Sequence, residues 1–112
     1  TVTEVVNNYV DNVVYFRINS AKIDKNQQIN IYNTAEFMKN NNAPIKVVGY
    51  ADKKTGTYEI NQRISERRAN AVKERLVKLG VPADRIMTFF KGDTVQPFAE
   101  NAKNRVVICE LE

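Results

Sequence analysis

The sequence IKVVGY at residues 45–50, a polar loop at 52–57 and the segment YEINQRISERRANAVKERLVKL at 58–79 decide the fold. The first piece is a short apolar run that ends in Gly-Tyr, which is typical of a buried strand. The third piece carries apolar residues at helical spacing and is followed by Gly80 and Pro82, residues that commonly end a helix. We therefore predict a strand at 45–50 and a long helix at 58–79.

Patterns on either side complete the element order. Branched and aromatic residues at 13–18 indicate a first strand, and apolar residues at helical spacing over 24–40 indicate a first helix. Residues 85–91 and 105–111 are predicted as two further strands. Because a strand–helix–strand connection favours a right-handed crossover, the strand at 45–50 should run parallel to the first. The order β-α-β-α-β-β predicts an α/β (α+β) fold, a two-layer sandwich with two helices on one face of a mixed four-stranded sheet.

The composition limits the kinds of protein to which the chain can belong. Its 112 residues, 43% hydrophobic and 27% charged, suit one folded domain over residues 1–112. No apolar run approaches the roughly 18 residues that a membrane helix needs, so no direct membrane insertion is expected. With no histidine and one cysteine, the chain lacks the usual imidazole acid–base groups and the common zinc ligand sets. We therefore expect no enzyme, no cofactor and no metal.

The net charge of +4 is concentrated in one segment. Residues 52–85 hold nine basic and five acidic side chains. A basic stripe can mark a nucleic-acid surface, but the interspersed acidic residues are more typical of a solvated helix face. We therefore expect no binding to nucleic acid.

One arginine lies on the apolar side of the predicted long helix. At 100° per residue, the apolar positions form an arc of about 160° that is expected to face the sheet: Ile60, Ile64, Ala71, Val72, Leu76 and Leu79. Arg68 falls in the middle of this arc. A guanidinium on the core side keeps its charge and needs a carboxylate, hydrogen-bond acceptors or a ligand anion. A buried structural ion pair and a binding role explain Arg68 equally well at this point.

Asp52 is a candidate partner for Arg68. It follows the strand at 45–50, and ligand clefts in open α/β sheets favour the carboxyl ends of strands. An aspartate and an arginine that converge could hold the ammonium and the carboxylate of one zwitterionic amino-acid head group. Alternatively, Asp52 pairs with Lys53, Lys54 or a loop amide, which is common for an aspartate in a loop.

Several motifs around these residues match a known pattern. They are VVGYAD at 47–52 with Thr55-Gly56, then NQRISERRANAV at 61–72, and near the end AKNRVV at 102–107. They resemble the signature of the OmpA-like (OmpA/MotB/Pal) peptidoglycan-binding domain, whose pattern is Gly-His-Thr-Asp, Thr-Gly, Asn-x-x-Leu-Ser-x-x-Arg-Ala-x-x-Val and a closing Asn-Arg-Arg-Val. The resemblance covers nearly the whole chain.

The resemblance implies a domain without catalysis, cut from the C-terminal part of a longer envelope protein. It would lie in the periplasm as part of an outer-membrane-associated protein and anchor the outer membrane or an envelope protein to the cell wall without covalent bonds. Its partner would be the peptidoglycan stem peptide, whose diaminopimelate is gripped at the positions of Asp52 and Arg68. The resemblance places four further residues in or beside the pocket: Asn19, Ala51, Asn61 and Arg105.

Two positions depart from the family pattern. Tyr50 and Ala51 stand where the family has histidine and threonine, so the hydroxyl contact of that threonine is lost. This leaves the stem-peptide preference open. It also motivates an alternative, a periplasmic protein-interaction or structural domain that no longer binds the wall. A homodimer stays open as well.

Overall fold

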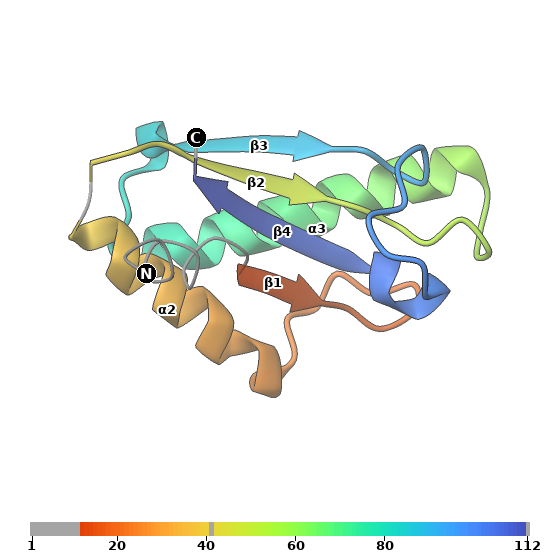
Figure 1. Cartoon of the computed structure of the whole chain (residues 1–112), viewed down its shortest axis with the longest axis horizontal. Helices are drawn as coiled ribbons and strands as arrows, with labels where there is room; N and C mark the ends of the chain where they lie inside the picture. The colour runs from red at the N-terminus through yellow and green to blue at the C-terminus, as the bar shows by residue number, and fades with distance from the viewer. Residues whose placement is uncertain (1–11, 41, 112) are drawn as a thin grey trace, which may run out of the picture.

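The fold is the two-layer sandwich that the sequence predicts, with both helices on one face of a mixed four-stranded sheet (Figure 1). The structure is a computed structural model that describes residues 12–40 and 42–111. Its elements follow in the order β1 (Asn12–Tyr15), the 3-10 helix η1 (Lys25–Gln27), α2 (Gln28–Lys39), β2 (Ile45–Gly49), α3 (Tyr58–Lys78), η2 (Ala83–Arg85), β3 (Ile86–Phe90), η3 (Asn101–Asn104) and β4 (Val106–Leu111). The predicted domain of residues 1–112 includes residues 1–11, 41 and 112, which lie outside the described residues.

The last strand lies between the first two. The strand order is β1-β4-β2-β3, with β4 antiparallel to both of its neighbours and β2 parallel to β3. As a result β1 and β2 run in the same direction, as expected, but they are not adjacent. Strand order does not follow from periodicity, because a buried apolar strand has the same pattern wherever it lies in the sheet.

The first strand is shorter than predicted. It ends at Tyr15, because the chain then turns, with the amide of Ser20 donating to the carbonyl of Arg17 at 3.1 Å. Asn19 lies in this turn with a φ of 54°, a left-handed conformation that asparagine tolerates better than most residues. The side chain of Ile18 is 54% exposed. The predicted strand residues 16–18 therefore form the beginning of a loop.

The long helix is rotated relative to its predicted orientation. Ile60, expected in the sheet-facing arc, is 46% exposed, and Ile64 is only half-buried. The buried residues of α3 are Asn61, Ser65, Arg68, Ala69, Val72 and Leu76. A Cβ on Gly49 would lie 2.1 Å from the carbonyl oxygen of Ser65, so β2 and α3 approach more closely than any other residue would permit. This contact turns the face of Ser65, and not that of Ile60, toward the sheet.

The apolar core lies between the helices and the sheet. Its largest buried side chains include Ile31, Met38, Ile45 and Leu76, all fully buried. A smaller cluster on the other face of the sheet joins Val48, Tyr50 and Val106 to Phe98 of the loop that precedes β4. Burial of this surface is the main stabilising contribution to the fold. None of the described helices is both long and apolar enough to cross a membrane.

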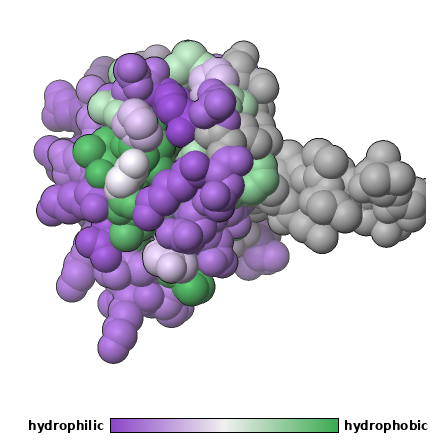
Figure 2. Space-filling view, turned by 90° about the vertical axis from the view of Figure 1, so that its left-hand side faces the viewer, coloured by the Kyte–Doolittle hydropathy of each residue, from purple (hydrophilic) through white to green (hydrophobic). Residues whose placement is uncertain are grey.

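The surface at the end where α2 and α3 finish is mostly hydrophilic and carries a hydrophobic patch (Figure 2). The polar cluster described next lies at the opposite end of β2, where that strand finishes.

Candidate ligand-binding site

Asp52 and Arg68 are both buried at the carboxyl end of β2. Asp52 is 3% exposed and Arg68 is 1% exposed. Asp52 follows the strand by three residues, and Arg68 reaches the same region from α3, behind the sheet. Asp52 and Arg68 therefore lie at the same end of the sheet, and their side chains make no direct hydrogen bond or ion pair with each other.

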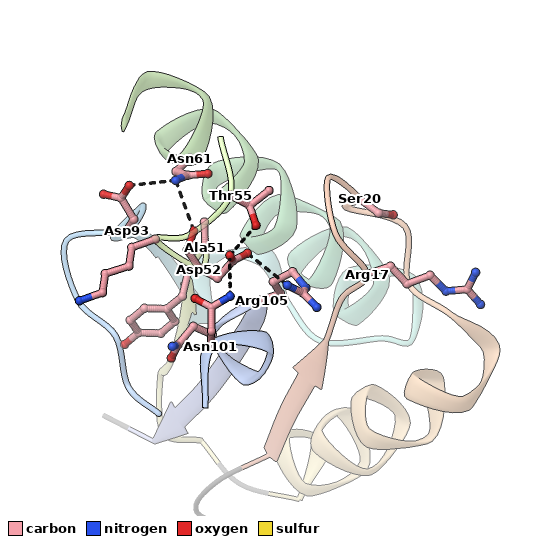
Figure 3. Close-up of polar contacts among 12 residues, drawn as sticks. Arg17, Ser20, Ala51, Asp52, Thr55, Asn61, Asp93, Asn101 and Arg105 are labelled. Atoms are coloured by element: carbon pink, nitrogen blue, oxygen red, sulfur yellow. Dashed lines mark hydrogen bonds and ion pairs between the residues drawn. The ribbon is translucent and has the colours of Figure 1, made fainter. Parts of the chain in front are cut away.

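The carboxylate of Asp52 is held by three side chains (Figure 3). The hydroxyl of Thr55 donates to Oδ2 at 2.6 Å, and the amide of Asn101 donates to the same oxygen at 3.0 Å. Nη1 of Arg105 lies 3.4 Å from Oδ1 and forms an ion pair. Of the alternative partners considered above, Lys53 and Lys54 are wrong, because the basic partner of Asp52 is Arg105, while an amide does bind it, that of the Asn101 side chain.

These contacts decide the charge of Asp52. Burial by itself would raise the pKa of this carboxyl. The hydrogen bonds from Thr55, Asn101 and Arg105, together with the positive charge of Arg105, outweigh burial and lower the pKa below its ordinary value. Asp52 is therefore a carboxylate at neutral pH and can accept a further cationic donor.

Arg68 is held by backbone carbonyl groups. Nε donates to the carbonyl of Ser20 at 2.8 Å, Nη1 to that of Tyr50 at 3.0 Å and Nη2 to that of Arg17 at 3.1 Å. The guanidinium carbon also lies 5.4 Å from the centre of the Phe16 ring, within range of a cation–π contact. Arg68 thus ties the turn after β1 to the end of β2.

No carboxylate of the described residues lies within 4 Å of the Arg68 guanidinium, so the buried ion pair considered above is not formed. Burial lowers the pKa of Arg68 to about 10, while the nearby charge of Asp52 acts in the opposite direction and that of Arg105 in the same one. The group remains charged at neutral pH. Three of its roughly five N–H donors are used by carbonyl groups, so it retains capacity to bind an anion.

Two of the four secondary candidates lie beside Asp52. Arg105 is its ion-pair partner. The amide of Asn61 donates to the backbone carbonyl of Asp52 at 3.4 Å and to the carboxylate of Asp93 at 2.8 Å (Figure 3). Asn61 therefore connects α3 to the loops on both sides of the site.

The other two secondary candidates are placed differently. The backbone of Ala51, a residue expected in or beside the pocket, is already bonded within the chain: its N–H donates to the carbonyl of Gly92 at 2.8 Å, and its carbonyl accepts from Gln96 at 2.9 Å. Asn19 lines a separate cavity of about 240 Å³ with Arg63 and Arg67. It is linked to the site through the neighbouring Ser20, whose carbonyl accepts from Arg68.

Sequence reasoning missed two residues that hold Asp52. Thr55 belongs to the Thr-Gly motif, and its spacing of three from Asp52 suits a hydroxyl that bonds back to the carboxylate. Asn101 comes from a polar loop that lies far along the chain, and no local pattern marks it. Its approach to Asp52 depends on how the loop before β4 folds over the end of the sheet (Figure 3).

Comparison with known proteins gives the family. The model of the OmpA family matches residues 15–107. The chain belongs to the OmpA family. It is 66% identical over 108 residues to Outer membrane protein 40 of Porphyromonas gingivalis, a match that covers 96% of this chain and 28% of that protein. The chain thus spans little more than a quarter of the length of this relative.

Solved structures share the fold. The peptidoglycan-associated lipoprotein from Burkholderia pseudomallei superposes with a TM-score of 0.84 at 24% identity, covering 90% of each chain. The cell wall anchor of the T6SS from Pseudomonas aeruginosa superposes with a TM-score of 0.69 at 25% identity, covering 87% of this chain and 74% of the other. The printed names describe an outer membrane protein, a peptidoglycan-associated lipoprotein and a cell wall anchor.

Proposed function

We propose that this chain binds peptidoglycan without covalent bonds, through the diaminopimelate of the stem peptide, and so anchors an envelope protein to the cell wall. Membership of the OmpA family supports the coarser part of the proposal, an envelope protein associated with peptidoglycan. We further propose that the domain lies in the periplasm, as part of an outer-membrane-associated protein, as its relative Outer membrane protein 40 suggests by its name.

The proposed binding of diaminopimelate rests on an imbalance of charge at the site. Asp52 has a cationic partner in Arg105, whereas the partners of Arg68 among the described residues are neutral carbonyl groups and the Phe16 ring. Asp52, Arg68 and Arg105 together carry one negative and two positive charges, and the nearby carboxylate of Asp93 is bound by the amide of Asn61 and by neither guanidinium. Because a buried cation is costly unless it meets an anion, a ligand carboxylate near Arg68 would be stabilised.

A zwitterionic head group suits this arrangement better than a bare anion. Its carboxylate would receive the remaining N–H donors of Arg68, in the fork geometry that favours carboxylates. Its ammonium would lie against Asp52, whose carboxylate already accepts three donors around its two oxygens and stays ionised. Arg105 would then be shared between Asp52 and the carboxylate of the ligand. Diaminopimelate carries such a head group at the end of its side chain.

The test is co-sedimentation with purified peptidoglycan sacculi. Asp52→Asn removes the carboxylate charge but keeps the shape, and Arg68→Lys keeps the charge but removes the fork. Each is expected to weaken sacculus binding at least tenfold. Asp84→Asn and Arg67→Lys make the same chemical changes at exposed positions and should bind as the unaltered chain does.

Because Arg68 is buried, each variant is first checked by thermal unfolding followed by circular dichroism, and binding is compared at a temperature where the variants are folded. Normal sacculus binding by both folded site variants would overturn the proposal. Calorimetric titration with a diaminopimelate-containing stem peptide separates it from the protein-interaction alternative, which predicts no saturable heat.

A further inference from the structure

A second cavity lies beside Asp52. It has a volume of about 300 Å³, and its lining includes Lys53, Lys54, Phe98, Ala99 and Asn101. Asn101 also donates to the Asp52 carboxylate at 3.0 Å, so one side chain forms the wall between the cavity and the proposed site. A ligand bound at Asp52 could therefore extend into this cavity.

The charge of the cavity is positive. Lys53 and Lys54 are exposed, and neither ammonium group has a carboxylate within ion-pair distance among residues 12–40 and 42–111. No acidic side chain belongs to the lining. The cavity therefore favours an anionic group on its occupant.

The remaining polar lining is already occupied by internal contacts. The side chain of Asn104 accepts from the amide of Phe98 at 2.8 Å and donates to its carbonyl at 3.0 Å. The side chain of Gln96 donates to the carbonyl of Ala51 at 2.9 Å and accepts from the amide of Lys53 at 3.3 Å. These two residues shape the cavity and leave the recognition of a ligand to the lysines and to Asn101.

Asn101 offers one unused acceptor. Its Oδ1 is buried and has no hydrogen-bond partner in the described part of the chain. A buried acceptor without a donor is unfavourable, and an incoming N–H group would relieve that cost. Phe98, which is half-buried and lies beside Tyr15, gives the cavity an apolar side. Together these groups match a carboxylate, an amide N–H and a short carbon chain.

We infer that this cavity is a subsite for an acidic amino-acid residue that is joined by a peptide bond to the far end of the bound amino acid, the end away from the zwitterionic head group held at Asp52 and Arg68. Its carboxylate lies near Lys53 and Lys54, its amide N–H donates to Asn101, and its carbon chain contacts Phe98. A volume of about 300 Å³ is at the lower end for ligand pockets, which suits one residue better than a glycan chain. The inference rests on the proposed function and adds that the domain distinguishes a free carboxylate from a carboxamide in the stem peptide.

The test compares two tripeptides by calorimetric titration. The first is alanyl-γ-glutamyl-diaminopimelate with its free glutamate α-carboxylate, and the second carries a carboxamide at that position. The unaltered chain is expected to bind the free acid about fivefold more tightly, the effect of one or two partly exposed charge pairs. The preference should decrease with added salt.

The double variant Lys53→Gln/Lys54→Gln should bind both tripeptides equally, at the affinity of the unaltered chain for the carboxamide. Lys22→Gln/Lys78→Gln, which removes two exposed lysines elsewhere, should retain the preference. Equal binding of the two tripeptides by the unaltered chain would overturn the subsite and leave the proposed function intact. Binding of neither tripeptide would overturn both.

Discussion

The two halves of α3 bury different kinds of side chain. In the half near its N-terminus the buried residues are polar or charged: Asn61, Ser65 and Arg68. In the half near its C-terminus they are apolar: Ala69, Val72 and Leu76. The first set faces the loops at the carboxyl end of β2, and the second faces the core beneath the sheet. One helix therefore serves the site with one half and the stability of the domain with the other.

The difference shows how a buried polar surface is maintained. Each of the three polar residues has partners within the chain, because a buried polar group without them would destabilise the fold. Asn61 binds Asp93, Ser65 accepts from the amide of Gly92 at 2.9 Å, and Arg68 binds three carbonyl groups. The apolar half needs no such partners. Substitutions in the two halves should therefore differ in their effects on stability and on binding.

Leu76→Ala should have the largest effect on stability. The side chain is fully buried, and its truncation removes apolar contacts and leaves a cavity. The free energy of unfolding is expected to fall by about 2–5 kcal/mol in urea titrations. Sacculus binding by the folded variant should be unchanged. A loss of binding at a temperature where Leu76→Ala is fully folded would contradict the separation of the two halves.

Ser65→Ala should have the next largest effect. It removes the acceptor of the buried Gly92 amide, and an unsatisfied buried donor costs about 1–3 kcal/mol. Ser20→Ala is the matched control, because the hydroxyl of Ser20 accepts from an exposed amide, that of Lys22. Urea titration of both variants checks the prediction. If Ser65→Ala were no less stable than Ser20→Ala, the bond to Gly92 would not contribute to stability.

Asp52 should make stability depend on pH. The pKa of Asp52 is lower in the folded chain than the unfolded value of about 3.9. Its contribution to the free energy of unfolding is therefore complete above that value and is lost as the pH falls through the folded pKa. In Asp52→Asn, the free energy of unfolding should decline less steeply below about pH 4 than in the unaltered chain. Asp84→Asn should keep the original slope. An identical decline in Asp52→Asn would show that Asp52 is not stabilised in its charged form.

Ile60→Ala should have the smallest effect. Helical periodicity placed Ile60 in the core, but its side chain is 46% exposed. Its truncation should change the free energy of unfolding by about 0.5 kcal/mol or less, as is usual for surface positions. A loss comparable to that of Leu76→Ala would support the orientation predicted from periodicity over the one in the structure.

Most of the fold was predictable because its elements carry strong local patterns. The two helices and four strands were placed within a few residues of their ends, and the two layers and the direction of β2 relative to β1 were correct. The rotation of α3 was not predictable from periodicity, because the close contact of Gly49 with Ser65 outweighs the burial of Ile60. The position of β4 between β1 and β2 also depends on contacts between strands distant in sequence.

The candidate site was predictable only in part. Arg68 was identifiable because a charge on the apolar side of a helix is unusual, and Asp52 because it follows a buried strand. Their partners were not identifiable. The spacing of side chains along the sequence does not indicate which carbonyl groups hold Arg68. It also does not indicate that Asn101 contacts Asp52.

The sequence by itself determined the element types, the one charged residue that α3 must bury and the absence of imidazole chemistry, since these depend on local periodicity and on which side chains are present. The tertiary structure decided which groups meet. It pairs Asp52 with Arg105 and places Arg68 against neutral carbonyl groups, because the positions of the loops near the end of β2 set the distances between these groups. That packing places the guanidinium groups of Arg68 and Arg105 near the carboxylate of Asp52, and the proposed ligand site rests on this arrangement.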